Sequence, residues 1–263
     1  MMNWQPEMLR GQTAVITGVS RKIGIGAAIA RALAEVGCNL FTTYFRPYDA
    51  TMPWGSQENE AAEILAELQT MGAEAAGLEL DLSQPTAPAE LFAVVQERFG
   101  PANILVNNAA FSTNDAIDTV NAQALDDHYA VNVRGMALLC QKFVQQFGEE
   151  GRVRNGRIIN ISSGQSFGPM PGELAYAASK GAVEAFSLSL SAALAGRGIT
   201  VNAIDPGITD TGWIPDELRQ TFVAQAPMGR IGRPEDAARL VRFLASPEAG
   251  WITGQLIRSR GGL

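Results

Sequence analysis

The sequence predicts an α/β fold, a doubly wound parallel sheet of about seven strands with helices on both faces. Short apolar runs alternate with longer helical patterns along the 263 residues, which is typical of βαβ units. Right-handed crossovers between parallel strands then place helices on both faces of the sheet. Because no linker or shift of composition divides the chain, we expect residues 1–263 to form a single domain.

Four apolar runs in the first half predict strands, at residues 13–17, 38–44, 75–80 and 104–107. Helical periodicity predicts helices between them, at residues 24–36, 56–71 and 86–99. In the first of these helices Ile25, Ile29 and Leu33 share one face, and Gly37 ends the helix.

The second half repeats the alternation. Strands are predicted at residues 157–162, 199–204 and 255–257, and helices at residues 124–147, 175–195 and 234–245. Two long connections, residues 46–55 and 205–215, each follow the carboxyl end of a strand, where open parallel sheets bind ligands. Residues 1–10 are expected to form an N-terminal tail.

Composition and charge exclude several functions. The net charge of −7 and the pI near 4.9 disfavour nucleic acid and anionic membranes as partners. Cys38 and Cys140 lie in apolar stretches, so we expect buried thiols, and no cluster of metal-ligating residues accompanies them. The start of the chain does not resemble a signal peptide, and no apolar run approaches the roughly 18 residues that span a bilayer. These observations predict a cytoplasmic protein.

A glycine-rich turn joins the first predicted strand to the first helix. Gly18, Gly24 and Gly26 are spaced G-x5-G-x-G, which differs from the common G-x-G-x-x-G pattern. Glycines let the chain turn tightly and let a phosphate approach the N–H groups at a helix N-terminus. In this context the turn predicts a dinucleotide site.

The end of the second strand indicates which dinucleotide binds. In NAD-binding proteins a carboxylate at this position bonds the ribose 2′-hydroxyl, but this strand ends Thr43-Tyr44-Phe45-Arg46, without an acid. Arg46, together with Ser20 and Arg21 of the glycine turn, is suited to a 2′-phosphate. We therefore expect NADP, with NADPH favoured over NADH.

Tyr176 and Lys180 are four residues apart near the start of a long predicted helix, so they share one face. A nearby ammonium favours the phenolate and lowers the pKa of a tyrosine, which makes the pair a usable general acid–base. Ser163 ends the preceding strand, where its hydroxyl can donate to a substrate oxygen. Asn132 is a polar residue on an apolar helical stretch and needs a partner if it is buried.

These motifs together resemble the short-chain dehydrogenase/reductase family from about residue 12 to residue 262. The resemblance is carried by Thr17-Gly18, Gly24-Ile25-Gly26, Asp81, Asn107-Asn108-Ala109-Ala110, Asn132, Ser163, Tyr176-x-x-x-Lys180, Pro206-Gly207-Ile-Thr-Asp-Thr211 and the stretch 227–236. It implies a Rossmann fold that binds NAD(P) and reduces a ketone to a secondary alcohol.

The resemblance also implies catalytic roles. Tyr176 protonates the carbonyl oxygen, Lys180 lowers the pKa of that tyrosine and binds the nicotinamide ribose, and Ser163 holds the substrate oxygen. Asn132 orders a water that links Lys180 to solvent. The adjacent Ser162 is the alternative to Ser163, but the interval to Tyr176 favours Ser163.

Cofactor roles follow from the same resemblance. Asp81 is expected to bond the adenine amino group, Asn108 the adenine ribose, and Ile208 and Thr211 the carboxamide and phosphates. The full expected set is Gly18, Ser20, Arg21, Gly24, Ile25, Arg46, Asp81, Leu82, Asn108, Ala109, Tyr176, Lys180, Pro206, Gly207, Ile208 and Thr211.

Two departures from the family pattern stand out. The glycine turn is two residues longer than usual, as in the enoyl-acyl carrier protein reductase branch, but that branch separates its tyrosine and lysine by six residues. The three residues between Tyr176 and Lys180 favour ketone reduction, with an enoyl-thioester reductase or a non-catalytic dinucleotide-binding sensor as alternatives. The second departure is Arg260, where the family usually has an aspartate before the glycine pair.

Aromatic and apolar side chains near the expected active site indicate the substrate. Phe111, Gln165 and Trp213 are expected to line an apolar cleft, and residues 206–228 to form the substrate-binding loop. A hydrophobic ketone or a 3-oxoacyl thioester fits such a cleft. The lone histidine, His128, is expected to be structural or on the surface. Family members usually pair their two long helices across subunits, so a homo-oligomer, a dimer or tetramer, is expected.

Overall fold

The computed structural model describes residues 7–148 and 155–262 and confirms the doubly wound parallel sheet. Its seven strands lie in the order β3-β2-β1-β4-β5-β6-β7, and every neighbouring pair is parallel. The strands are β1 (Thr13–Ile16), β2 (Asn39–Tyr44), β3 (Ala75–Glu79), β4 (Ile104–Asn107), β5 (Gly156–Ile161), β6 (Ile199–Asp205) and β7 (Leu256–Arg258). The apolar runs predicted these strands because parallel strands are buried on both faces.

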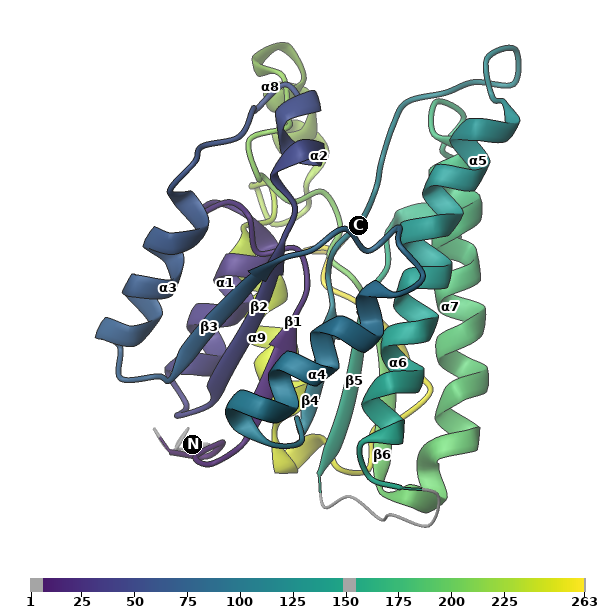
Figure 1. Cartoon of the computed structure of the whole chain (residues 1–263). Helices are drawn as coiled ribbons and strands as arrows, with labels where there is room; N and C mark the ends of the chain where they lie inside the picture. Colours follow the sequence, from purple (N-terminus) through teal and green to yellow (C-terminus); the bar gives the residue numbers. More distant parts are fainter. Residues whose placement is uncertain (1–6, 149–154, 263) are drawn as a thin grey trace.

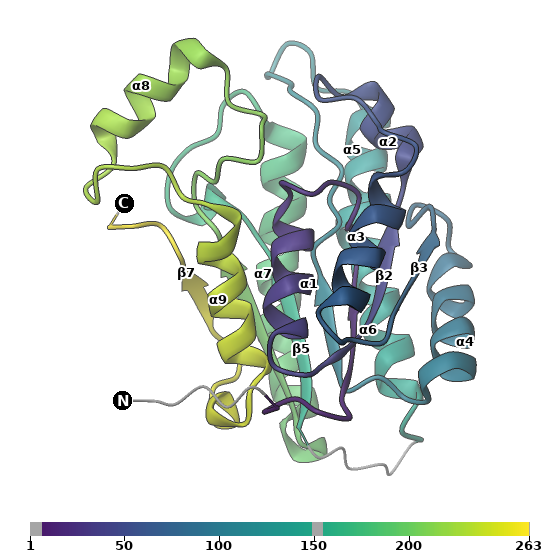
Figure 2. The same cartoon turned by 90° about the vertical axis from the view of Figure 1, so that its left-hand side faces the viewer.

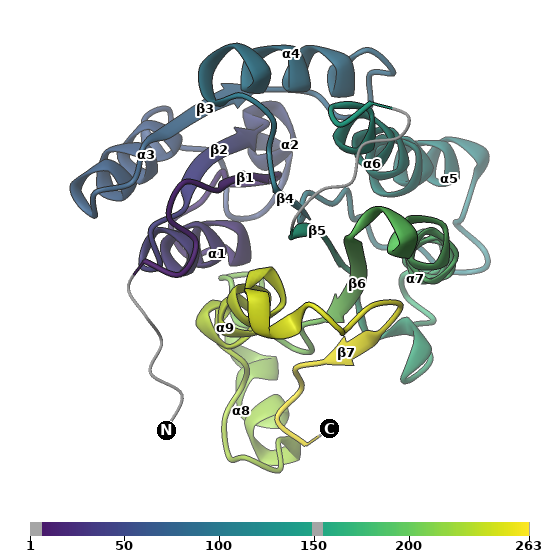
Figure 3. The same ribbon diagram turned by 90° about the horizontal axis from the view of Figure 1, so that it is seen from below.

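Helices cover the two faces of the sheet in separate layers (Figures 1 and 3). One layer holds α1 (Ile25–Ala34), α3 (Glu60–Thr70) and α9 (Pro234–Ala245), with α1 and α9 side by side in Figure 2. The other holds α4 (Ala87–Phe99), α6 (Met136–Gln145) and α7 (Leu174–Leu194). Each layer buries its own apolar cluster against the sheet, so the sheet lies between two cores.

Two short helices lie in segments that we expected to be loops. Helix α2 (Arg46–Thr51) begins the 46–55 connection, with Pro47 in its first turn, and α8 (Asp216–Gln225) lies within 206–228. Helix α8 has no fully buried residue, so it lacks the apolar stripe by which sequence reasoning detects a helix. Both helices lie beyond the carboxyl ends of the strands, at the top of Figure 1.

The helix expected at residues 124–147 is not a uniform α-helix. It consists of α5 (Ala122–His128), a π-helical segment at Tyr129–Gly135, and α6. Such π turns insert a residue into the helix and often occur at functional sites. Asn132 lies in this segment, and Gly135 approaches the Leu82 carbonyl so closely that a Cβ would lie 2.7 Å from its oxygen.

Part of the segment that we expected to form an N-terminal tail belongs to the core. Leu9 is completely buried, and its N–H donates to the Val36 carbonyl at 2.9 Å, so it belongs to the core. Residues 1–6 of the predicted tail lie outside the described residues. Cys38 and Cys140 are buried free thiols, as predicted, and burial raises the pKa of each to about 12.

Within residues 7–148 and 155–262, no helix has the length and apolar character needed to cross a bilayer. The same residues contain no group of three histidine, cysteine or acidic side chains placed to hold a metal ion.

The order of the strands places the candidate site. Strand order reverses between β1 and β4, so the chain leaves these two strands toward opposite sides and opens a crevice between them. The glycine turn follows β1, the Asn108 segment follows β4, Ser163 follows β5 and Pro206 follows β6. All four segments therefore meet at one edge of the sheet.

Close packing of the glycine turn gives a test of this arrangement. A Cβ on Gly26 would lie 2.5 Å from the Gly18 carbonyl oxygen, whereas a Cβ on the helical Gly181 meets no atom within 4 Å. We expect Gly26→Ala to lower the free energy of unfolding by about 1–3 kcal/mol through overpacking. As the matched control, Gly181→Ala is expected to raise it by about 0.5–1 kcal/mol. Urea unfolding measures both, and equal effects of the two substitutions would contradict the packing.

Candidate active site

The glycine turn is fixed to the neighbouring strand by side-chain hydrogen bonds. The Asn108 amide nitrogen donates to the carbonyls of Thr17 at 2.9 Å and Gly18 at 3.0 Å. The Thr17 hydroxyl in return accepts from the backbone N–H groups of Asn108 and Ala109, both at 3.0 Å. The side chain of Asn108 thus orders the turn itself, a role that the sequence did not indicate.

The turn fits a dinucleotide. Gly18 has a φ of +74°, and a Cβ there would lie 2.7 Å from Ala109 Cα, so only glycine suits the position. Gly24 is the N-cap of α1 and Ile25 its first residue, and no side chain of the described chain caps this end. The first N–H groups of α1 are thus available to a pyrophosphate.

Arg46 and Arg21 already have protein partners. Arg46 forms a two-pronged ion pair with Glu79, with Nη2 2.6 Å from one carboxylate oxygen. Arg21 donates to the Thr211 carbonyl at 2.8 Å, and its guanidinium lies 4.2 Å from the centre of the Trp54 ring. Arg21 therefore connects the glycine turn with both long connections. Ser20 lies beside it in the same turn.

Asp81 and Leu82 follow β3, at the carboxyl end of the strand. Burial raises the pKa of the Asp81 carboxyl, but hydrogen bonds from Gln84 and Ser83 outweigh this effect, so the pKa is lower than usual. The Ser83 N–H lies 2.9 Å from Asp81 Oδ1. Leu82 is buried and packs its carbonyl against the π turn at Gly135.

Tyr176 and Lys180 face the same space from the first turns of α7. Lys180 is 3% exposed, its Nζ donates to the Ile161 carbonyl at 2.8 Å, and it lies 5.6 Å from the centre of the Tyr176 ring. Burial lowers the pKa of Lys180 to about 8, so the ammonium form still dominates at neutral pH. Asp115 caps this helix by accepting from the Ala175 N–H at 3.0 Å.

Burial has the opposite effect on the tyrosine. It raises the pKa of Tyr176 to about 12, and a hydrogen bond with the Ser163 hydroxyl opposes the rise. The sequence predicts that Lys180 lowers the pKa of Tyr176, but in the structure the side chain that opposes the rise is Ser163. At neutral pH the Tyr176 hydroxyl is therefore protonated.

The structure distinguishes the two adjacent serines. Ser162 is 2% exposed and donates to the Glu184 carboxylate at 2.7 Å, away from the tyrosine. Ser163 points to Tyr176, because successive side chains of an extended segment point in opposite directions. The geometry thus pairs Ser163 with the tyrosine.

Asn132 has the partners that its burial requires. Its Oδ1 accepts from the Phe111 N–H at 2.7 Å, and its Nδ2 donates to the Phe111 carbonyl at 2.8 Å and to Ser179 Oγ at 2.9 Å. The amide therefore ties the π turn to the segment after β4 and to α7.

His128 is also buried, with Nδ1 2.7 Å from the Ala124 carbonyl and Nε2 accepting from the Thr113 N–H.

The three expected substrate residues differ in their surroundings. Phe111 packs its ring 5.0 Å from His128 and 5.4 Å from Tyr48, whose α2 segment the sequence did not connect with the site. The Gln165 amide turns to Glu184 at 2.6 Å. Trp213 is 44% exposed, stacks near Phe222 at 6.3 Å and donates to the Thr209 carbonyl.

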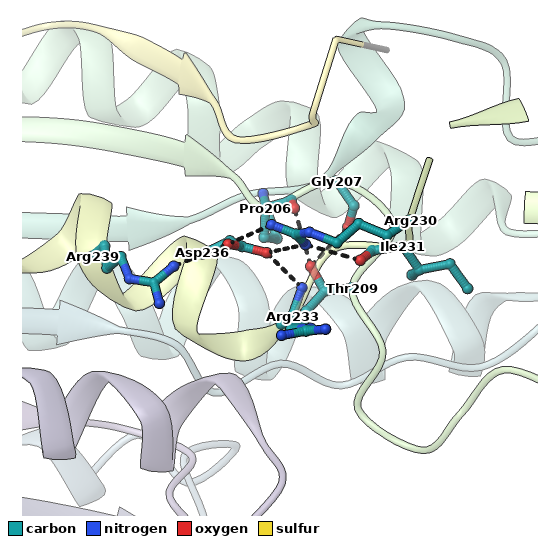
Figure 4. A network of polar contacts seen from close by, with 8 residues as sticks. All are labelled: Pro206, Gly207, Thr209, Arg230, Ile231, Arg233, Asp236 and Arg239. Carbon is teal, nitrogen blue, oxygen red and sulfur yellow. Dashed lines mark hydrogen bonds and ion pairs between the residues drawn. The ribbon is translucent and has the colours of Figure 1, made fainter. Parts of the chain in front are cut away.

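Hydrogen bonds join the start of the segment after β6 to its end, before α9 (Figure 4). Thr209 pairs with Gly232, and the Thr209 hydroxyl donates to the Pro206 carbonyl at 3.0 Å. Asp236 of α9 fixes the end of this segment, because its carboxylate accepts from the Arg233 N–H and the Arg230 guanidinium, as Figure 4 shows. Pro206, Gly207, Ile208 and Thr211 thus lie in or beside a fixed base, and α8 projects from it.

Two further residues near the site escaped sequence reasoning. Asp205, at the end of β6, is completely buried and bonds Arg260 at 2.9 Å, so the residue that departs from the family pattern has a specific partner. Glu184, on α7, accepts hydrogen bonds from the loop that carries Ser163. Glu184 follows Tyr176 and Lys180 at the same interval of four residues, and this spacing is the signal by which the sequence could have indicated it.

The fold and the group of Tyr176, Lys180 and Ser163 at this edge of the sheet are typical of a dinucleotide-dependent oxidoreductase. A family model described as enoyl-(acyl carrier protein) reductase matches residues 18–263. The chain is 47% identical over 249 residues to the uncharacterized oxidoreductase YjdA of Bacillus subtilis, covering 95% of each chain. It is 34% identical over 255 residues to the 3-oxoacyl-[acyl-carrier-protein] reductase FabG of Staphylococcus aureus, covering 96% of this chain and 98% of that one.

Solved structures of related proteins have the same fold as this chain. A short-chain dehydrogenase from Burkholderia cenocepacia, solved in complex with NADP, superposes with a TM-score of 0.85 at 31% identity, covering 97% of this chain and 98% of that one. A blue fluorescent protein from a metagenomic library, solved with NADPH, gives a TM-score of 0.84 at 31% identity, with the same coverage. The chain belongs to the short-chain dehydrogenase/reductase family and is an oxidoreductase that uses a nicotinamide dinucleotide.

Proposed function

We propose that the protein reduces a ketone, either a hydrophobic ketone or a 3-oxoacyl thioester, to a secondary alcohol with NADPH, and that Tyr176 is the general acid. The observation that carries this proposal is the convergence of Tyr176, Ser163 and Lys180 at one edge of the sheet. The resemblance to an oxoacyl reductase supports the substrate class.

In the proposed reaction, residues of this chain orient the carbonyl oxygen and donate a proton to it. When bound, the nicotinamide ring supplies the hydride that reduces the carbonyl carbon. When substrate binds, Ser163 donates its hydroxyl hydrogen to the carbonyl oxygen and so holds that oxygen beside the Tyr176 hydroxyl. Tyr176 gives its proton to that oxygen as negative charge develops there. Because its pKa is about 12, the hydroxyl stays protonated until the oxygen becomes basic enough to take the proton.

Lys180 supports this transfer with its charge. Its ammonium, anchored on the Ile161 carbonyl, lies close enough to stabilise the tyrosinate that remains after proton transfer, and it would bind the nicotinamide ribose hydroxyls. Asn132 holds the π turn and α7 together, and we propose that the turn also orders the water through which the tyrosine is reprotonated. The glycine turn, with Gly18 and the N-terminus of α1, would hold the pyrophosphate.

The reaction is tested by NADPH oxidation against simple ketones, β-ketoesters, 3-oxoacyl thioesters and a crotonyl thioester. We expect turnover of ketones and no reduction of the crotonyl alkene. Tyr176→Phe removes the proton donor but keeps the ring, so kcat is expected to fall by about 10²–10⁴-fold with little change in NADPH affinity.

Reduction of the alkene without reduction of any ketone would show an enoyl reductase instead, an alternative that the longer glycine turn and the matched family model favour. A loss of no more than about threefold in Tyr176→Phe would favour a cofactor-binding sensor or another mechanism. NADPH binding by Tyr176→Phe, followed by nicotinamide fluorescence, is the control for folding.

We propose that Arg21 and Arg46 give the preference for NADPH over NADH. Arg46 begins the helix that follows β2, and Arg21 Nε lies 4.0 Å from Asp49 Oδ1 in that helix, near where the adenosine ribose of a dinucleotide binds in this fold. Arg21→Ala combined with Arg46→Ala is expected to weaken NADPH binding about tenfold to hundredfold through loss of charge-assisted hydrogen bonds. NADH binding is the internal control and is expected to change little. Unchanged NADPH affinity would contradict the assignment.

We propose that the protein is a homo-oligomer. Leu125 on α5, Tyr129 in the π turn and Leu188 on α7 are 46%, 56% and 62% exposed, so the helices that family members pair across subunits carry accessible apolar side chains. Light scattering at micromolar concentration is expected to give a multiple of 28.0 kDa, and the mass of one chain would contradict the proposal.

A further inference from the structure

The loop between β5 and α7 carries Ser163 and has little regular structure of its own. It contains one short 3₁₀ turn, Gly164–Ser166, and Ser163 itself is extended. A hydroxyl on such a loop needs external support if it is to meet both a substrate oxygen and Tyr176. The structure provides that support from two sides.

The first support is Glu184. One of its carboxylate oxygens accepts from Ser162 Oγ at 2.7 Å, Gln165 Nε2 at 2.6 Å and Ser166 Oγ at 3.3 Å. These residues flank Ser163 on both sides. Glu184 lies one turn after Lys180 and two turns after Tyr176 on α7, so the three side chains share a face of that helix. The loop is thus fastened to the same helix that carries the acid–base pair.

The second support is Arg260. Its guanidinium lies 4.5 Å from the centre of the Phe167 ring, and its Nη1 is 2.6 Å from the place where a Cβ on Gly164 would stand. The same nitrogen bonds the buried Asp205 carboxylate, whose other oxygen accepts from the Gly207 N–H at 2.9 Å. The C-terminal segment therefore contacts the loop at Gly164 and Phe167 and connects it to the end of β6.

We propose that Glu184 and Arg260 are positioning residues for the reaction, and that they hold the Ser163 loop in register with Tyr176 from its two sides. Neither side chain is assigned a contact with substrate or cofactor. Their effect passes through Ser163, and a shift of a reacting group by about 1 Å can cost on the order of a hundredfold in rate. This inference rests on the role of Ser163 proposed above.

Glu184 gives the sharpest test. Glu184→Ala is expected to lower kcat for the ketone about tenfold or more, with the KM for NADPH changed less than about twofold. Glu184→Gln keeps an acceptor oxygen for Ser162 and is expected to restore most of the rate. Ser189→Ala is the matched control, because its exposed hydroxyl on the same helix bonds only the Ala185 carbonyl. The dissociation constant of NADPH and the midpoint of thermal unfolding are measured for every variant and are expected to stay near the wild-type values.

A double-mutant cycle with Ser163→Ala identifies the route of the effect. If Glu184 acts through Ser163, Ser163→Ala combined with Glu184→Ala loses no more rate than Ser163→Ala alone. Losses that multiply, or a full rate in Glu184→Ala beside a slow Ser163→Ala, overturn the inference and leave the proposed function standing. A full rate in Ser163→Ala contradicts the proposed role of that serine, and the inference fails with it.

Arg260 is tested together with its partner, since removing one member of a buried ion pair leaves the other charge unpaired. Asp205→Asn combined with Arg260→Gln keeps hydrogen-bonding groups on both sides. We expect this variant to fold, to bind NADPH as the wild type does and to lose kcat about tenfold. A wild-type kcat in this variant overturns the part of the inference that concerns Arg260.

Discussion

The buried amide of Asn132 is the constraint on which the arrangement of the site depends. A buried amide must satisfy its donors and acceptor, and this one does so on two segments outside its own π turn: the Phe111 backbone and Ser179 of α7. The Ser179 hydroxyl in turn donates to the Tyr176 carbonyl at 2.8 Å. One side chain thus fixes the first turns of α7, where Tyr176 and Lys180 lie, against the segment that follows β4. The π turn at Tyr129–Gly135 is the local geometry that accommodates it.

The sheet and most of the helices could be predicted from the sequence because burial on both faces makes each parallel strand a continuous apolar run. The same reasoning fails where tertiary contacts decide the local structure. Helix α8 has no buried stripe, the π turn contacts partners distant in the sequence, and Leu9 belongs to an apolar cluster formed with distant elements and bonds Val36. Residue patterns within one segment carry no signal for such contacts.

The active-site side chains could be predicted as a set, but their electrostatics could not. Spacing places Tyr176 and Lys180 on one face of a helix, and the structure brings Ser163 to them. The direction of the tyrosine pKa depends on how many atoms surround the hydroxyl, and burial outweighs the neighbouring groups. Gln165 and Asn108 could also be identified by residue type, but the partners of their amides could not be predicted. The Gln165 amide bonds Glu184, and the Asn108 amide bonds the glycine turn.

The arginines and the lysine at this edge of the sheet show why the presence of a cation does not by itself predict affinity for a phosphate. Arg46 is paired with Glu79, Arg260 with Asp205, and Lys180 with a backbone carbonyl. A phosphate that binds Arg46 must therefore replace or share the Glu79 carboxylate, so the free energy gained is the difference between two charge-assisted interactions. If Arg46 binds the 2′-phosphate as proposed, Glu79 affects cofactor choice as directly as the arginine does, since it sets the energy against which a 2′-phosphate competes. Arg260 differs because Asp205 is completely buried and the Arg260 side chain is only 11% exposed, so little solvent competes for that pair.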